Sequence, residues 1–272
     1  MLTMSFKSYF WRIPRVILIP LLRVRFRNKF KRPTKIYLEN QYLKLIETPV
    51  SPGKISTIYF YFPMRLPRYF VGIQERLDIL AREYCLDQIE KFESGVIVDI
   101  GSNIGEFTLA ANQLFPNCEY VRFEPSSTEC RASQLNLANV SNVLIEKPLW
   151  SEIVVIPFFD QNQSGDSSLF KPTSEAKATL RETATIDDEI RKLGITSIEI
   201  LKLEAEGAEP EILKGAPLTL KFVKRVTADL GPERGLAQSR TFDEVNQILV
   251  DAGFRLSGKN PGGRECYLYT RD

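Results

Sequence analysis

A short apolar run that stops at a glycine turn constrains the fold of this chain more than any other feature. The run is Val-Ile-Val-Asp-Ile over residues 96–100, and Gly101-Ser102-Asn103-Ile104-Gly105 follows it. Its β-branched residues predict a strand buried on both faces of a parallel sheet. From Ile104 the apolar residues recur at helical spacing. Gly101 and Gly105 therefore lie in a strand-to-helix turn, where a ligand can approach the backbone closely.

A second predicted strand, residues 119–123, delivers a carboxylate to the same edge of the sheet. The strand ends at Glu124, which is 23 residues beyond Gly101. In dinucleotide-binding folds an acidic residue at this spacing accepts hydrogen bonds from the two hydroxyls of a ribose. The two strands together predict a nucleoside cofactor.

Three features argue against a nicotinamide nucleotide. The loop is Gly-x-x-x-Gly, so Asn103 stands where a pyrophosphate-binding loop has its second glycine. Asp99 would repel a pyrophosphate, whereas it suits a ligand with an ammonium and a sulfonium group. Two later predicted strands are followed at once by Glu204 and Asp229, which makes the edge acidic. This acidic edge fits S-adenosylmethionine.

Three sequence blocks resemble the signature blocks of FkbM-type methyltransferases. They are Asp99 to Gly105, Phe123-Glu124-Pro125, and residues 201–209 with the sequence Leu-Lys-Leu-Glu-Ala-Glu-Gly-Ala-Glu. In the third block, Glu204 stands where the family commonly has an aspartate. The resemblance runs from about Arg68 to the C-terminus. It implies a class I methyltransferase fold, α/β and Rossmann-like, with S-adenosylmethionine as cofactor. It also implies O-methylation of a sugar or polyketide-type hydroxyl.

The end of the chain agrees with that fold. Residues 254–256 and 265–269 flank a turn rich in glycine and proline, which predicts a final β-hairpin. We therefore expect a seven-stranded mixed sheet with helices on both faces and a C-terminal antiparallel hairpin. A dehydrogenase is not expected to end in this way.

These considerations give a set of expected cofactor contacts. Asp99 and Glu124 would hold the methionine amine and the ribose. The loop residues Gly101, Ser102, Asn103 and Gly105 would shape the turn around the cofactor. Trp150 follows the third predicted strand and either stacks on the adenine or belongs to the core.

The chain contains no histidine, so the acceptor's proton must go to a carboxylate, a lysine, a tyrosine or water. We expect Glu204 to be the catalytic base, with Asp229 and Glu206 as the alternatives. The competing interpretation is that Glu204 only orients the acceptor or the methionine amine. Glu209 either takes part in the site or stabilises the start of the next helix. The carboxylates could hold Mg²⁺, but no spacing demands a metal.

The N-terminal segment is basic, whereas the rest of the chain has an excess of acidic residues. Residues 1–35 hold ten Lys or Arg and no acidic residue, which leaves 26 basic and 34 acidic residues for the rest. We expect three segments: a basic, amphipathic extension (1–35), a β lead-in with a covering helix (36–92), and an S-adenosylmethionine-binding domain (93–272). In the second segment Tyr84 faces either the core or the cofactor.

Three interpretations of the basic extension remain open. Its apolar run of about ten residues is interrupted by Pro14, Arg15 and Pro20, so it is too short to span a bilayer. It could anchor the protein to an anionic lipid surface, pack as an arm on the acidic domain, or bind nucleic acid. Nucleic acid is the least favoured partner, because nothing else in the chain is basic. The four scattered cysteines and the lack of a signal sequence predict a cytoplasmic protein, either free or at the cytoplasmic face of a membrane.

The sequence therefore supports one main function and leaves two alternatives open. The main one is S-adenosylmethionine-dependent O-methylation of a small-molecule or glycan hydroxyl, with the polar stretch 161–174 as a candidate lid over the acceptor. The alternatives are a catalytically silent, membrane- or glycan-associated scaffold and a nicotinamide-dependent oxidoreductase. The sequence does not determine the acceptor or the oligomeric state.

Overall fold

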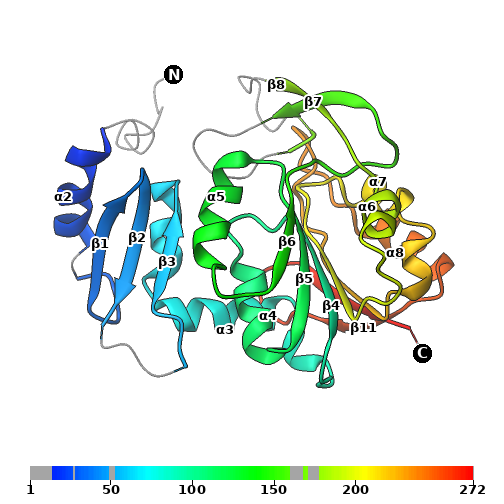
Figure 1. The fold of residues 1–272 in the computed structure, drawn as a ribbon, viewed down its shortest axis with the longest axis horizontal. Helices are drawn as coiled ribbons and strands as arrows, with labels where there is room; N and C mark the ends of the chain where they lie inside the picture. The colour runs from blue at the N-terminus through cyan, green and yellow to red at the C-terminus, as the bar shows by residue number, and fades with distance from the viewer. Residues whose placement is uncertain (1–13, 27, 49–52, 160–167, 171–177, 272) are drawn as a thin grey trace.

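The computed structural model describes residues 14–26, 28–48, 53–159, 168–170 and 178–271. Three sheets are present in this part of the chain: a large seven-stranded sheet, a three-stranded N-terminal sheet and a two-stranded ribbon. Figure 1 shows the N-terminal sheet beside α5, with the large sheet beyond it.

The large sheet has the order β11-β12-β10-β9-β4-β5-β6. Its strands are β4 (Gly95–Ile100), β5 (Cys118–Phe123), β6 (Asn142–Ile145), β9 (Ile200–Leu203), β10 (Arg225–Asp229), β11 (Arg255–Lys259) and β12 (Cys266–Thr270). Strands β6, β5, β4, β9 and β10 are parallel, whereas β12 runs antiparallel to both of its neighbours. The predicted mixed sheet with its C-terminal hairpin is confirmed.

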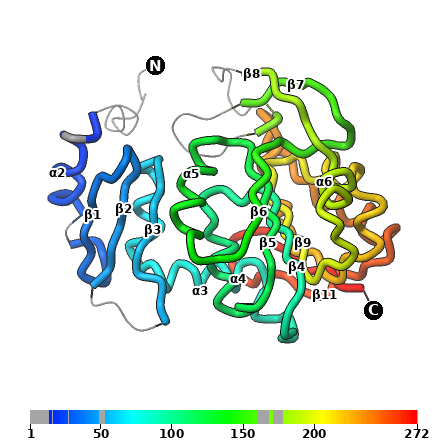
Figure 2. The backbone as a smooth tube through the Cα atoms, in the orientation of Figure 1, coloured from blue at the N-terminus to red at the C-terminus, as the bar shows by residue number. Residues whose placement is uncertain are grey.

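Helices cover both faces of this sheet (Figures 1 and 2). One face carries α3 (Ile73–Glu83), α4 (Glu106–Leu114) and α5 (Ser127–Asn136), and the other carries α6 (Ile186–Lys192), α7 (Glu209–Lys214) and α8 (Phe242–Asp251). A separate apolar core fills each side, because strands such as β4 and β9 bury side chains on both faces. The strand ends that form the acidic edge are thereby held on a rigid support.

The N-terminal sheet differs from the hairpin-like lead-in that the sequence predicts. It contains β1 (Thr34–Glu39), β2 (Tyr42–Glu47) and β3 (Thr57–Phe60), all antiparallel, and α2 (Arg15–Phe26) packs against β1. The prediction overlooked β2, in which Lys44 interrupts an otherwise apolar run that ends at Glu47. Asn136 of α5 joins this sheet to the large domain through hydrogen bonds with the backbone of Tyr59. No helix in the described part of the chain is long and apolar enough to cross a membrane.

Short helical segments and a ribbon complete the described chain. They are η1 (Pro63–Tyr69), η2 (Leu86–Gln88), η3 (Thr219–Phe222), β7 (Val155–Phe159) and β8 (Ala178–Glu182). The predicted strand before Asp229, over residues 221–228, is wrong in its first half, where η3 ends and before β10 begins at Arg225. The carboxylate of Asp187 accepts from the amides of Leu218 and Thr219 and holds a helical turn there. Most of the predicted lid, 161–174, lies outside the described residues.

The Thr241-Phe-Asp-Glu244 pattern at the start of α8 predicts a capping box, which is not formed. The Thr241 hydroxyl donates to Glu209 Oε2 at 3.0 Å and does not cap α8. The same Glu209 carboxylate accepts from the backbone amides of Ala205 (2.8 Å) and Gly207 (3.1 Å). Glu209 therefore holds the loop that follows β9 in place. This is a structural role, which was one of the two roles that the sequence left open for Glu209.

Candidate active site

A cavity of about 630 Å³ lies at the carboxyl ends of the parallel strands. The loops after β4, β5, β6, β9 and β10 contribute to its wall, as do η1, α3 and the turn between β11 and β12. Ligands of open α/β sheets bind outside the carboxyl ends of the strands. The cavity is therefore the candidate active site, and it lies at the edge of the sheet where the sequence places the cofactor.

The glycine loop forms one wall as expected. Gly101 has φ +70°, and a Cβ there would come within 1.8 Å of the carbonyl oxygen of Glu204, so only glycine fits. Gly105 has φ +86° and packs against Leu137. Ser102 is buried and lines the cavity, and its Oγ has no hydrogen-bond partner among the described residues. A buried hydroxyl in this position is ready to bond to a ligand.

Glu124 occupies the position predicted for the ribose contact. Its Oε2 accepts from the amide of Asn103 and its Oε1 from the amide of Ser126, both at 2.8 Å. The carboxyl group lines the cavity, and burial raises its pKa to about 7 against the opposing effect of these amides. The two backbone donors fix the orientation of Glu124 and leave lone pairs for a ligand.

Asp99 does not take the position that the sequence suggested for it. It is fully buried, accepts from the Thr108 hydroxyl at 2.8 Å, and is absent from the cavity wall formed by the described residues. The ammonium group of Lys202 lies 3.2 Å from Asp99 Oδ1 and donates to the carbonyl oxygens of Ile100 and Gly101. The chain's own lysine thus neutralises Asp99. The parallel register that pairs Asp99 with Lys202 places them together.

Glu204 reaches the cavity but is held by three donors. The Tyr84 hydroxyl donates to Oε2 at 2.5 Å, Lys202 Nζ lies 3.1 Å from Oε2, and Arg264 bonds to Oε1. Burial acts to raise the pKa of Glu204, but Arg264, Lys202 and Tyr84 outweigh it and hold the pKa well below its ordinary value. A carboxylate stabilised in this way is a poor proton acceptor. The geometry favours the alternative orienting role over the expected base.

Arg264 is a site residue that the sequence interpretation missed. It comes from the turn between β11 and β12 and pairs with Glu204, Asp229 and Glu83. Its guanidinium also lies 5.0 Å from the centre of the Tyr84 ring. The only sequence signal was a lone arginine in a turn rich in glycine and proline.

Other carboxylates also line the cavity, among them Glu206, Asp229 and Glu233. Glu206 lines the wall with a strained φ of +51°, and Asp229 accepts from the amide of Gly231 and pairs with Arg264. Burial raises the pKa of Asp229. Burial, assisted by the charges of Asp229 and Glu204, raises the pKa of Glu233 to about 8. Glu233 also lines the cavity and was not among the expected site residues.

Trp150 is not brought to the cavity. The wall in the described chain includes its neighbour Leu149 and also Phe158, but not Trp150, whose ring packs 6.0 Å from that of Phe170. This placement agrees with the core interpretation of Trp150. Leu149 and Phe158 are among the apolar groups of the cavity that an adenine could contact.

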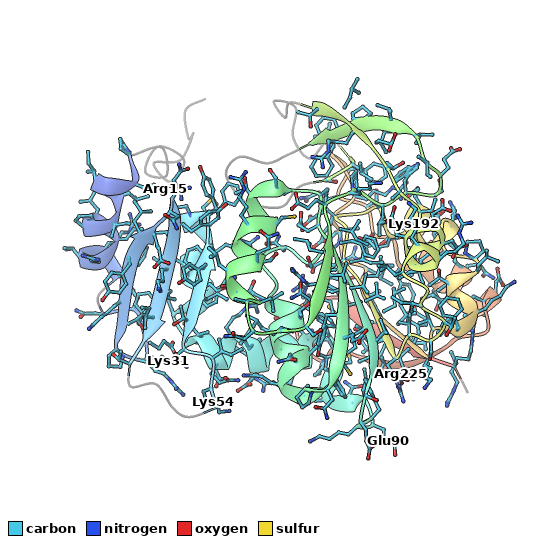
Figure 3. All side chains as sticks on the ribbon, viewed as in Figure 1. Arg15, Lys31, Lys54, Glu90, Lys192 and Arg225 are labelled. Atoms are coloured by element: carbon cyan, nitrogen blue, oxygen red, sulfur yellow. The ribbon has the colours of Figure 1, made fainter. Side chains whose placement is uncertain are left out.

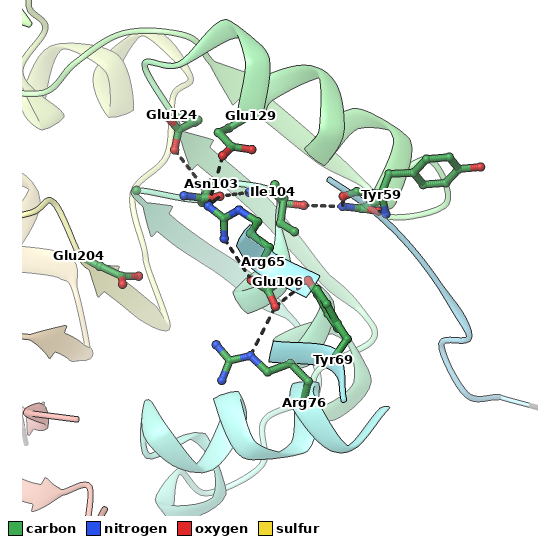
Figure 4. Close-up of polar contacts among 12 residues, drawn as sticks. Tyr59, Arg65, Tyr69, Arg76, Asn103, Ile104, Glu106, Glu124, Glu129 and Glu204 are labelled. Carbon is green, nitrogen blue, oxygen red and sulfur yellow. Dashed lines mark hydrogen bonds and ion pairs between the residues drawn. The ribbon is translucent and has the colours of Figure 1, made fainter. Parts of the chain in front are cut away.

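A buried network joins the glycine loop to the N-terminal elements (Figure 4). Arg65 of η1 contacts Asn103 and pairs with Glu129 at 3.2 Å and with Glu106 at 3.8 Å. Glu106 also accepts from the Tyr69 hydroxyl at 2.9 Å. Arg65 is 2% exposed, so this network ties η1 to the cofactor loop. Figure 4 shows Glu204 set apart from the network, at the end of another strand.

Comparison with known proteins identifies the family to which this site belongs. A sequence model of the FkbM methyltransferase domain matches residues 99–256. The chain belongs to the FkbM methyltransferase family. As a member of this family it takes S-adenosylmethionine as methyl donor. The family assignment therefore argues against the alternative of a nicotinamide-dependent oxidoreductase.

Two relatives of this chain are named as methyltransferases. "Methyltransferase 1" of Beauveria bassiana is 28% identical over 202 residues, covering 65% of this chain and 79% of its own length. "Methyltransferase sdnD" of Sordaria araneosa is 25% identical over 213 residues, covering 64% of this chain and 79% of its own length. Among solved structures, Aeropyrum pernix fibrillarin is similar with a TM-score of 0.45 and 10% identity, covering 88% of this chain and 99% of that one.

The residues of the cavity fit the methyl donor. Glu124 offers a fixed carboxyl group to ribose hydroxyls, and the unpartnered Ser102 Oγ offers a further polar contact. Among the described residues no cluster of three or more His, Cys, Asp or Glu is placed to hold a metal ion.

Proposed function

We propose that this FkbM methyltransferase transfers a methyl group to a hydroxyl oxygen of a sugar, a glycan or a related polyhydroxylated small molecule. One observation carries the proposal: Glu206, Asp229 and Glu233 line the same cavity as Glu124 and the glycine loop. Carboxylates accept hydrogen bonds from hydroxyl groups, and the same wall carries cations such as Lys147, Lys202 and Arg264, so both signs of charge face an acceptor. A neutral acceptor with several hydroxyls suits it best.

We assign the acceptor's proton to Glu233. A general base works best when its pKa lies near the operating pH, and Glu233 meets that condition with a pKa of about 8. Glu204 does not meet it, because its three donors stabilise the ionised form. Glu204, Lys202 and Arg264 then form a fixed charged wall that orients the reactants.

The cofactor supplies an electrophilic methyl group on a sulfonium centre. Glu124 and the glycine loop would hold its ribose, and Leu149 and Phe158 would contact its adenine. Alignment of the acceptor oxygen by the carboxylate wall supplies much of the catalysis, because a fixed geometry removes the entropic cost of bringing two reactants together.

The test is methyl transfer from isotopically labelled S-adenosylmethionine to a panel of acceptors. The panel contains neutral saccharides, phosphorylated saccharides, carboxylic acids and amines, and NMR locates the transferred methyl group. We expect label on a hydroxyl oxygen of a neutral saccharide or polyol, with Glu124→Ala as the cofactor-binding control. Label on nitrogen, carbon or a carboxylate would overturn the proposal. Tight cofactor binding without any transfer would favour the silent scaffold.

A further inference from the structure

Helix α2 presents two apolar faces, and only one of them is covered. Leu18, Ile19 and Leu22 are buried against the N-terminal sheet. Ile17, Leu21 and Val24 are 57%, 43% and 79% exposed. Their spacing of four and three residues places them on one side of the helix, away from the buried face.

Exposed apolar residues at helical spacing are more informative than isolated ones. A single exposed leucine on a protein surface needs no explanation, but a stripe on a helix of 12 residues is typical of an interaction surface. The arm interpretation of the basic extension explains the buried face, which packs on the small sheet. It does not explain the outer stripe.

The charges on and after α2 favour a negatively charged partner. Arg23 and Arg25 belong to the last turn of α2, and Lys29, Lys31 and Lys35 are exposed in the segment that follows. No acidic residue occurs between residues 1 and 35. Figure 3 places Arg15 and Lys31 at the end of the molecule formed by α2 and the small sheet.

We propose that the outer face of α2 docks this protein onto an anionic membrane surface. The helix would lie in the plane of the interface, with Ile17, Leu21 and Val24 in the acyl boundary and the cations at the headgroups. A second copy of the chain fits less well, because a twofold interface through α2 would bring two basic segments together.

The position of α2 is compatible with catalysis at such a surface. No described residue of α2 lines the cavity, and Figures 1 and 2 show α2 at the far side of the small sheet from the large sheet. Docking through α2 would therefore leave the active site open. The proposal does not depend on the identity of the acceptor.

The test is co-sedimentation of the full chain with vesicles. Phosphatidylcholine vesicles with roughly one third phosphatidylserine are compared with pure phosphatidylcholine vesicles at low and high salt. We expect binding to the anionic vesicles only, weakened strongly by salt because exposed charges are screened. The triple variant Ile17→Ser/Leu21→Ser/Val24→Ser should reduce anionic binding at least about tenfold.

A matched triple variant controls for the loss of exposed apolar surface. Leu193→Ser/Val250→Ser/Leu256→Ser changes three residues of the large domain that are 39%, 48% and 46% exposed, and it should bind vesicles like the wild type. Unchanged circular dichroism shows that both variants are folded. Absence of vesicle binding, equal binding to both vesicle types, or full binding by the α2 variant would each overturn the proposal. So would conversion of a dimer to a monomer by the α2 variant.

Discussion

Glu124 and Glu204 are the same residue type at the ends of two strands of one sheet, yet their surroundings give them opposite properties. Glu124 is held by two backbone amides, and burial raises its pKa to about 7. Glu204 is held by Tyr84, Lys202 and Arg264, which lower its pKa. Backbone donors orient a carboxyl group without supplying a full charge, whereas two cations fix it in the ionised state. Position on the sheet therefore does not determine the chemistry of a carboxylate.

The difference also separates two parts of the cavity. The part around the glycine loop is built from local turns and is suited to hold a neutral ribose. The part around Glu204 is a charged cluster assembled from β9, β10, α3 and the β11–β12 turn. Substitutions in the two parts should consequently affect different measurements.

The largest effect is expected at Glu233. Because a general base typically contributes about 10²–10⁴-fold, Glu233→Gln should lower kcat by that order at saturating cofactor. Wild-type activity should rise with pH through about 8, where Glu233 loses its proton, and the variant should lack this rise. Steady-state kinetics from pH 6 to 9 measures both. Glu244→Gln, which changes an exposed residue of α8, is the control. A pH profile of activity that Glu233→Gln leaves unchanged would refute Glu233 as the general base.

Glu124→Ala should come next. Hydrogen bonds to a charged acceptor contribute about 1.5–3 kcal/mol each, so loss of the ribose contacts should weaken cofactor affinity about 100-fold after partial compensation by water. Calorimetric titration with S-adenosylhomocysteine measures this affinity. An unchanged affinity in a folded variant would show that the ribose is held elsewhere.

Arg264→Met should mainly reduce stability. Removing one member of a buried charge pair costs about 3–5 kcal/mol, and because the Arg264 side chain is 25% exposed we expect about 2 kcal/mol. Ionised Glu204 stabilises the fold fully above its ordinary pKa of 4.5 and loses this effect as the pH falls. The difference in free energy of unfolding between wild type and variant should therefore shrink below about pH 4.5.

Urea denaturation at pH 7 and pH 4 provides this comparison. Arg240→Met is the matched control, because Arg240 pairs with Glu265 at the exposed side of the same turn and its loss should change stability little. If the two variants lost equal free energies of unfolding, the charge cluster around Arg264 would contribute no special stability to the fold.

Glu204→Gln should have the smallest effect on turnover. If Glu204 only orients the reactants, we expect kcat to fall less than about tenfold, since the proton goes elsewhere. Single-turnover kinetics at saturating cofactor isolates this step. A fall of a hundredfold or more with unchanged cofactor affinity would restore Glu204 as the base.

The sequence predicted what local patterns control. The strand before Gly101 and the position of Glu124 follow from a strand-to-helix turn and from strand length, and both were correct. Arg264 and Glu233 could not be placed, because their positions depend on how long loops pack across the sheet. Lys202 was within reach of prediction, since a lysine in an otherwise apolar strand must find a buried partner.

The most direct test of the account is the pH dependence of cofactor affinity in wild type and Glu124→Gln. Only ionised Glu124 accepts two hydrogen bonds from the ribose, so with a pKa of about 7 the wild-type affinity for S-adenosylhomocysteine should increase roughly tenfold from pH 6 to pH 8. Glu124→Gln should bind more weakly and show no such increase. A wild-type affinity that is flat or falls over this range, or a pH dependence that survives in Glu124→Gln, would contradict the assignment of Glu124 as the ribose ligand.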